Sequence, residues 1–268
     1  MDEHYKNRWF GFTLALIGAL LGIGVNIFIF FTQYNAMVAA QLALYPLRTN
    51  WKIITYLLPV WAAMGCVGGF LYIFGLHGFY ENKNYAYKIS MIANVFALEF
   101  SFWPIIPALD TGLMPYYALI FLPNALIYLL LNFVVGKKNF GRVIFGLITG
   151  MAFVMSVING TASLNIFWMK GELFYIIANP LHWCAGICFG IITIGVMLAP
   201  KKWVRILAIC TTVLEMAIGI PMGIITTIEK GEFSMYSAAP AMSIVILLII
   251  AIPYFWEKIV KPEDLPRE

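Results

Sequence analysis

The sequence predicts an all-α polytopic membrane protein with eight transmembrane helices. Of its 268 residues, 62% are hydrophobic and only 11% are charged, and the mean hydropathy is +0.86. Soluble domains contain about half apolar and a quarter charged residues, so this composition excludes a soluble fold. Apolar windows of about twenty residues, the length that crosses the hydrocarbon core of a bilayer, recur along the chain. No polar segment between them is long enough to form a separate soluble domain.

The first of the predicted spans has some features of a signal peptide. It follows Lys6 and Arg8, and the small residues at 38–43 resemble a cleavage site. At about 24 residues, however, the run is too long for the apolar core of a signal peptide and has the length of a span. We therefore interpret it as a transmembrane helix. The eight predicted spans cover residues 9–32, 53–75, 87–109, 114–136, 140–160, 174–198, 203–227 and 236–256.

The distribution of basic residues predicts a cell-membrane protein with both termini in the cytoplasm. Cytoplasmic segments of membrane proteins collect Lys and Arg. With eight spans in this orientation, 13 of the 17 basic residues are cytoplasmic, whereas a seven-span arrangement breaks the pattern at one end. The same bias explains the net charge of +4 without a nucleic-acid partner. The cytoplasmic set is Lys6, Arg8, Lys83, Lys88, Lys137, Lys138, Arg142, Lys201, Lys202, Arg205, Lys258, Lys261 and Arg267; the outer set is Arg48, Lys52, Lys170 and Lys230.

The second half of the chain resembles a diverged copy of the first, which predicts two four-helix membrane repeats, residues 1–136 and 137–268. When Pro59 is aligned with Pro180, Glu99 falls on Glu215 one span later. Because each repeat has an even number of spans, the two copies would share one orientation and be related by an axis along the membrane normal. The other aligned pairs are Gly65 with Gly186, Gly69 with Gly190, Pro104 with Pro221, Pro123 with Pro240, and Asn26 with Asn159.

Pairs of glycines four positions apart occur in several spans. Hydrophobicity does not drive the association of helices in lipid, but such pairs let two backbones approach closely and gain dispersion contacts. They predict a compact bundle rather than a ligand site. The pairs are Gly18/Gly22, Gly65/Gly69, Gly146/Gly150, Gly186/Gly190 and Gly219/Gly223.

Two carboxyl groups, those of Glu99 and Glu215, lie near the middle of their predicted spans. An ionised carboxylate at that depth costs about 3 kcal/mol on insertion scales, and no Lys or Arg lies deep enough to pair with either one. Each group is therefore neutral, bound to a cation, or directed into a cavity lined by protein or water. We predict that both glutamates couple to a proton or cation. The alternative is that each protonated Glu bridges two helices by a hydrogen bond worth about 1 kcal/mol.

Other polar residues within the spans are candidates to line the same cavity. Thr211 and Thr212 share a helical face with Glu215, whereas the corresponding face around Glu99 is apolar and aromatic. Asn26 and Asn159 lie in the first and fifth spans, where each can either line the cavity or bridge helices.

Several prolines are predicted to interrupt spans on the outer side of the two glutamates. A proline frees a backbone carbonyl and kinks the helix, and broken helices often flank a binding site in transporters. This arrangement predicts a cavity that opens outward. The prolines are Pro104, Pro107, Pro123, Pro221 and Pro240.

A quinone pocket at the outer face is the second site that the sequence suggests. His182 and Trp183 lie toward the outer end of the sixth span, and Tyr236 begins the eighth. A haem with two histidine ligands is disfavoured because His77 and His182 lie on opposite sides of the membrane, whereas a haem held by one histidine and a methionine stays open. His182 also points away from the nearby Cys184, so we predict no metal site. The sequence identifies no cofactor.

Three function classes remain open. The chain contains no phosphate-binding loop, HExxH or GxSxG, which favours a protein other than an enzyme. The first class is a carrier or translocating subunit that couples a small solute or ion to its midplane carboxylates. The second is a membrane anchor that binds quinone in a respiratory electron-transfer complex, and the third is a structural subunit. All three require the lipid bilayer, and the last two require other membrane subunits as partners.

Overall fold

The computed structural model describes residues 7–47 and 49–260, which form α-helices with short π and 3-10 turns and contain no strand. The chain divides into two compact units, unit 1 up to Lys138 and unit 2 from Asn139. In the described residues, seven helices are long and apolar enough to cross a membrane, or eight if one bent pair counts as a span. The predicted fold class, an all-α polytopic membrane protein, is therefore confirmed. Four residues of the topology prediction, Lys6, Arg48, Lys261 and Arg267, lie outside the described residues.

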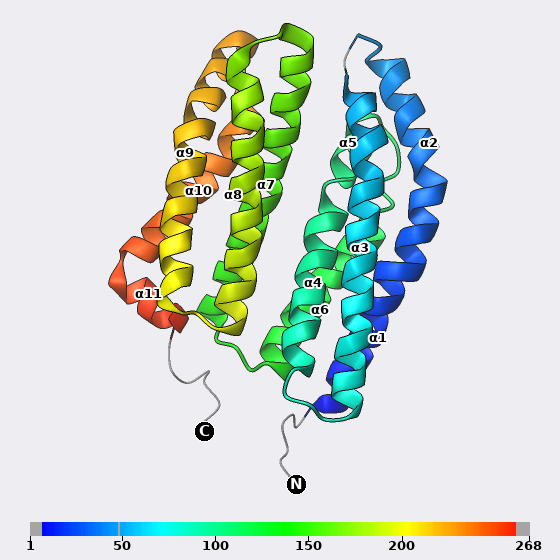
Figure 1. The fold of residues 1–268 in the computed structure, drawn as a ribbon, viewed down its shortest axis with the longest axis vertical. Helices are drawn as coiled ribbons and strands as arrows, with labels where there is room; N and C mark the ends of the chain where they lie inside the picture. The colour runs from blue at the N-terminus through cyan, green and yellow to red at the C-terminus, as the bar shows by residue number, and fades with distance from the viewer. Residues whose placement is uncertain (1–6, 48, 261–268) are drawn as a thin grey trace. The chain divides into compact units, whose positions relative to one another are not determined.

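Unit 1 begins with the longest helical run of the chain (Figure 1). This run covers Arg8–Leu44 and continues twelve residues beyond the predicted end of the first span. At 1.5 Å per residue it is about 55 Å long, more than the hydrocarbon core requires. Its elements are α1 (Arg8–Leu20), the π turn η1 (Leu21–Val25) and α2 (Asn26–Leu44); α3 (Asn50–Tyr80), α4 (Ala86–Phe102), α5 (Ile105–Asp110), α6 (Ala118–Leu130) and the π turn η2 (Leu131–Val135) follow.

Close contact between glycines joins the first two helical runs of unit 1. A Cβ atom on Gly22 would lie 2.8 Å from the Cα atom of Gly69, and one on Gly18 would lie 2.5 Å from the ring of Tyr72. Both distances are shorter than a van der Waals contact, so only glycine permits this approach. The predicted packing role of these glycines is confirmed at both positions.

The prolines break fewer helices than predicted. The third span is interrupted at Pro104, where α4 ends and α5 begins. By contrast, α6 continues through Pro123 and α9 through Pro221, and Pro240 lies in the first turn of α10. A first-turn proline is tolerated because its missing N–H has no partner in the helix in any case.

Unit 2 is a four-helix bundle followed by a short helix. α8 packs against α7 and α9, and α10 packs against α9 and α7, so the four helices enclose a common interior. α7 extends ten residues beyond the predicted end of the fifth span and stops at Gly171, whose φ of 73° suits glycine. The elements are α7 (Phe140–Lys170), α8 (Leu173–Leu198), α9 (Lys202–Lys230), η3 (Met235–Ser237), α10 (Ala238–Ala251) and α11 (Pro253–Val260).

The eighth predicted span, residues 236–256, is not one straight helix. The segment Met235–Ala251 and the helix after it meet at an angle of 90°. The bend lies at Ile252, whose φ of −82° and ψ of 111° are extended. Pro253 causes it, because a proline disfavours the helical conformation of the residue before it. The prediction of a span through residue 256 was therefore wrong beyond Ala251.

Replacing Gly22 by alanine is expected to lower the free energy of unfolding by about 1–3 kcal/mol, because the new methyl group meets the backbone of Gly69 rather than a movable side chain. Gly24 in the same π turn is the matched control, since its Cβ would have no atom within 4 Å. Gly24→Ala should leave stability unchanged or raise it by up to about 1 kcal/mol. Reversible unfolding in mixed micelles measures both; equal stability of the two variants would contradict the packing role.

Candidate functional site

Glu215 lies on the face of α9 that points into the bundle of unit 2. Its side chain is completely buried, whereas Val213 and Ile220 on the other side of the helix are exposed. The 3.6-residue period of the helix places the buried positions in one continuous stripe. The stripe consists of Val204, Ala208, Thr211, Thr212, Glu215, Ile218, Met222 and Thr226.

The carboxyl group of Glu215 is paired with the imidazole of His182 on α8. The His182 Nδ1 atom lies 2.9 Å from Oε1 and 3.0 Å from Oε2 of Glu215, and neither side chain is exposed. A proton on either Nδ1 or the carboxyl group allows a hydrogen bond between the two side chains. This contact offsets part of the cost of burying two ionisable groups in an apolar bundle.

This pair corrects the sequence analysis, which placed His182 toward the outer surface and gave Glu215 no partner. The lengths of the two helices already indicate this pairing, because α8 and α9 form an antiparallel hairpin with a short connection. At 1.5 Å per residue, His182 lies about 24 Å before the end of α8 and Glu215 about 20 Å after the start of α9, so the two reach similar depths. Histidine, like Lys and Arg, can pair with a buried carboxylate.

Two serines from the remaining helices lie within about one helical turn of the level of this pair. Pro240 on α10 contacts the Cβ position of Gly219, which lies 3.2 Å from Glu215 Oε1. Ser243 is one turn from Pro240 and Glu215 is one turn from Gly219, so the antiparallel helices bring both to the same depth. Ser156 on α7 lies 3.7 Å from the Cβ position of Gly186, one turn along α8 from His182. We call Ser156, His182, Glu215 and Ser243 the polar layer.

The polar layer contains several atoms that make no hydrogen bond within the described part of the chain. These atoms are buried, and a buried polar atom without a partner costs about 1–3 kcal/mol. Such atoms in one layer make it the candidate site of this unit. The atoms are Ser156 Oγ, His182 Nε2 and Ser243 Oγ; Glu215 Oε1 has no hydrogen bond besides its 2.9 Å ion-pair contact with His182.

Apolar packing separates the polar layer from the end of the bundle where α7 meets α8. Tyr175, Ala178, Ile218 and Met222 form a buried cluster between them, against which Tyr236 packs. These large side chains would have to move before water or a solute could reach the layer from this end.

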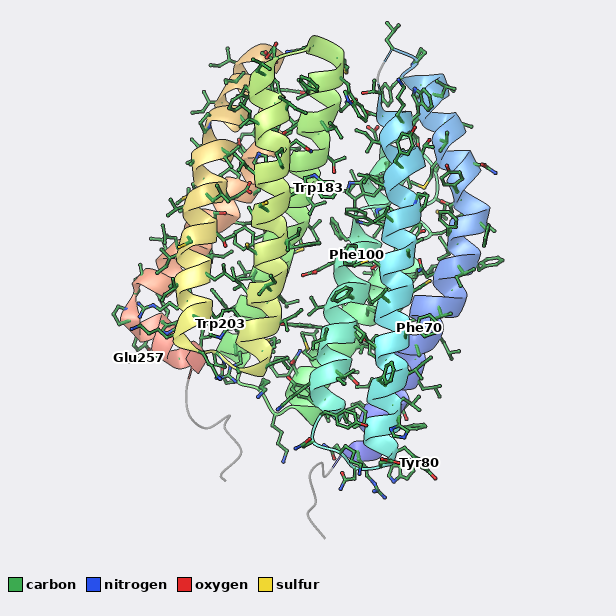
Figure 2. All side chains as sticks on the ribbon, viewed as in Figure 1. Phe70, Tyr80, Phe100, Trp183, Trp203 and Glu257 are labelled. Carbon is green, nitrogen blue, oxygen red and sulfur yellow. The ribbon has the colours of Figure 1, made fainter. Side chains whose placement is uncertain are left out.

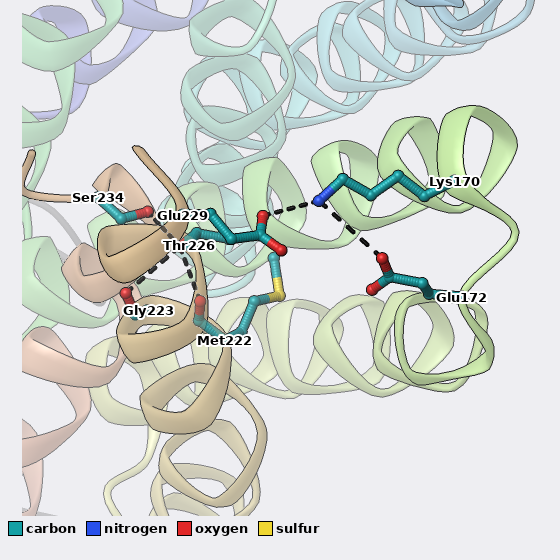
Figure 3. Close-up of polar contacts among 7 residues, drawn as sticks. All are labelled: Lys170, Glu172, Met222, Gly223, Thr226, Glu229 and Ser234. Carbon is teal, nitrogen blue, oxygen red and sulfur yellow. Dashed lines mark hydrogen bonds and ion pairs between the residues drawn. The ribbon is translucent and has the colours of Figure 1, made fainter. Parts of the chain in front are cut away.

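Charged groups close that same end of the bundle. Figure 3 shows Lys170 Nζ between two carboxylates, 2.7 Å from Glu229 Oε2 and 4.0 Å from Glu172 Oε1. Thr226 Oγ1 donates to Ser234 Oγ at 2.6 Å nearby and ties α9 to the segment after it (Figure 3). Toward the other end, Thr149 and Thr193 join α7 to α8 through hydroxyl groups 2.8 Å apart. The layer is thus enclosed from both ends.

The predicted cavity-lining residues divide between the two units. Thr211 and Thr212 are buried on the Glu215 face of α9. Asn159 donates from Nδ2 to the Tyr236 carbonyl at 3.0 Å and so links α7 to the start of the α10 segment. Asn26 belongs to unit 1, where its Nδ2 donates to the Ala62 carbonyl at 2.7 Å. Both asparagines therefore make helix-bridging bonds.

Glu99 in unit 1 has a different environment from Glu215. Its side chain is buried, and Oε1 has no hydrogen-bond partner among the described residues. A polar network exists on the same helix, where Asn94 Nδ2 donates to the Tyr72 hydroxyl at 2.7 Å and to the Asn124 carbonyl at 2.9 Å. Glu99 lies five residues from Asn94, on another face of α4, and is not part of this network. The two glutamates are therefore not equivalent.

The residues of the predicted quinone pocket point to different neighbours. His182 pairs with Glu215, the ring of Trp183 contacts the Cβ position of Gly160 on α7, and Tyr236 packs against the apolar cluster. The quinone pocket stays a prediction. Among the described residues, no group of three or more His, Cys, Asp or Glu side chains could hold a metal ion.

Comparison with known protein families, with curated proteins and with solved structures finds no match to this chain. The fold nevertheless defines its class: a multi-pass helical membrane protein with an enclosed ionisable pair in one of its two units.

Replacing His182 by alanine is expected to lower the free energy of unfolding by about 3 kcal/mol, because the buried Glu215 loses its partner. His77→Ala is the control: the His77–Glu81 pair, 3.4 Å apart, is exposed and should contribute less than about 1 kcal/mol. The free energies of unfolding of the two variants would be measured in mixed micelles at neutral pH. If both variants lose equally little free energy of unfolding, the burial of Glu215 does not depend on His182.

Proposed function

We propose that this protein is a membrane carrier, or the translocating subunit of one, that couples proton movement to the movement of a small solute or ion. The observation that carries this proposal is the buried His182–Glu215 pair with an unpartnered Nε2 atom. Ionisable groups inside the membrane are rare and usually mark an ion or proton pathway. In this proposal the basic ends of the spans face the cytoplasm of a cell membrane.

The pair has the chemistry of a proton acceptor. With one proton between Nδ1 and the carboxyl group and none on Nε2, the pair carries one negative charge, and a second proton on Nε2 makes it neutral. Imidazole is the side chain that ordinarily changes charge between about pH 5 and 8. The hydroxyl groups of Ser156 and Ser243 can rotate to donate or accept, so they can serve both states of the ring. Protons could therefore enter and leave without a change of backbone fold.

α9 also has a weak point beside the pair. Pro221 lies within the helix, where it removes the hydrogen bond to the carbonyl four residues earlier, that of Ala217. That carbonyl lies between Glu215 and the apolar cluster around Met222. Local bending there would move the cluster relative to the polar layer, as alternating access requires.

Glu99 is the second candidate coupling group of the proposal. It has a buried carboxyl oxygen without a partner among the described residues but no histidine, so it would act separately from the pair. Proton-coupled transport would be measured for a Glu99→Gln variant beside Glu215→Gln. The comparison shows whether the coupled proton binds in one unit or in both.

Glu215→Gln is expected to abolish proton-coupled transport, because glutamine keeps the shape of the side chain but cannot hold a proton. The purified protein would be reconstituted into proteoliposomes containing a pH-sensitive dye. An inward proton gradient would then be applied with a panel of amino acids, sugars, nucleosides, organic cations and metal cations. We expect proton flux that depends on at least one of these solutes and is at least tenfold lower in the variant.

Glu229→Gln is the control, since Glu229 is an exposed acid on the same helix that pairs only with groups at the end of the bundle. It should retain most of the flux. Undiminished solute-dependent flux in folded Glu215→Gln protein would refute the coupling role. The pair would then be a structural bridge between α8 and α9.

A further inference from the structure

The short helix α11 is directed across the axis of the bundle rather than along it. It meets the preceding helical segment at 90°, beside the start of α7 and the connection between α8 and α9 (Figure 1). Figure 2 shows Glu257 of α11 and Trp203 of α9 at this same end of unit 2. Because α10 runs with the membrane-spanning helices, a helix at a right angle to it lies along the membrane surface.

Two arginines fix α11 in this position. Arg142 Nε donates to the Ile259 carbonyl at 3.0 Å, and Arg205 Nη2 donates to the Ile250 carbonyl at 3.0 Å. Trp256 is buried against the bundle with the Arg205 guanidinium 5.7 Å from its ring centroid. These contacts attach the residues before and after the bend to α7 and α9. They therefore fix the orientation of α11 relative to the bundle of unit 2.

The bend at Ile252 and the other side of α11 expose aromatic and aliphatic groups. Ile252, Tyr254 and Phe255 are 41%, 59% and 44% exposed. The ammonium group of Lys258 lies 4.3 Å from the ring centroid of Tyr254. Aromatic rings combined with lysine are characteristic of segments that lie at the level of lipid headgroups.

Four basic side chains lie at this end of unit 2, together with one exposed acid, Glu257 of α11. Lys201 and Lys202 are exposed at the start of α9, whose N-terminal amides receive no side-chain cap. Arg205 is half-buried and adds its positive charge to this end while its Nη2 atom donates to the Ile250 carbonyl. At the opposite end of unit 2 the acids Glu172 and Glu229 flank Lys170. A helix N-terminus with clustered Lys and Arg at the membrane surface favours a phosphate group.

We propose that α11, with Lys201, Lys202, Arg205 and Lys258, forms a binding site for anionic phospholipid at one membrane surface. The aromatic side of α11 enters the headgroup region, and the basic groups bind the phosphate and any further negative charge of the headgroup. The lipid thereby stabilises the end of the bundle at which α7, α9 and α11 meet. This inference does not depend on the proposed transport function.

A triple variant, Lys201→Gln, Lys202→Gln and Lys258→Gln, tests the charge requirement. The thermal unfolding midpoint would be measured in micelles titrated with phosphatidylglycerol or phosphatidylcholine. Ligands that bind only the folded state raise it in proportion to the logarithm of their concentration. We expect phosphatidylglycerol to raise the midpoint of the natural protein by several degrees more than phosphatidylcholine, and the variant to lose at least half of that difference.

The matched control replaces the same three lysines by arginine, which keeps the charge and should keep the effect. Inorganic phosphate and glycerol phosphate, added without lipid, distinguish a headgroup site from a site for free phosphate and should have little effect. Equal shifts with the two lipids, or the full shift in the glutamine variant, would overturn the proposal.

A spin label tests the position of α11 directly. The label would be attached at Phe255→Cys, with Cys66, Cys184, Cys188 and Cys210 replaced by alanine, in nanodiscs containing phosphatidylglycerol. Relaxation by oxygen and by a water-soluble nickel chelate measures its depth. We expect a depth at the boundary of headgroups and acyl chains; a label in bulk water would refute the membrane-surface position.

Discussion

Hydrocarbon offers no hydrogen bonds, and every polar group of this chain that enters it must find a partner within the protein. The backbone meets this requirement by forming helices throughout the spans. Where Pro59 interrupts the ladder of α3, the carbonyl four residues earlier, that of Thr55, accepts a bond from the Tyr34 hydroxyl at 3.3 Å. Side-chain amides meet the same need, as Asn26 does with the Ala62 carbonyl. Because of the same constraint, a buried polar atom without a partner is costly, and its position indicates a candidate site.

The two units satisfy this constraint with different chemistry. The interior of unit 1 contains neutral amides and phenols, including Asn132, which accepts a bond from the Tyr87 hydroxyl at 2.7 Å. Unit 2 instead contains an ionisable pair between two helices, His182 with Glu215. A neutral network can hold helices together but has no proton to exchange near neutral pH. This difference is why the proposed proton coupling centres on unit 2, although each unit contains a buried glutamate.

Packing in the bundle and chemistry in the polar layer depend on each other. Gly219 and Gly186 have no side chain, which lets Pro240 of α10 and Ser156 of α7 come close to the helices that carry Glu215 and His182. Dispersion between closely packed backbones is a main source of helix association in lipid. The small residues that favour a compact bundle thus also bring one polar side chain from each of four helices to within about one helical turn of one another.

The sequence by itself determined the fold class and the approximate positions of the spans, because the mean hydropathy of a segment is the sum of its residues' contributions. The first and fifth helical runs continue twelve and ten residues beyond their predicted ends. The sequence also identified Glu99 and Glu215 as deeply placed acids from their distance to the span ends. It extended the eighth span past Ala251, although Pro253 was a local sign of the bend. Only the tertiary structure decided that His182 faces Glu215, that Asn26 and Asn159 bridge helices, and that α11 turns aside. Those contacts depend on the rotation and register of each helix against its neighbours, which arise when side chains pack and cannot be summed from single residues.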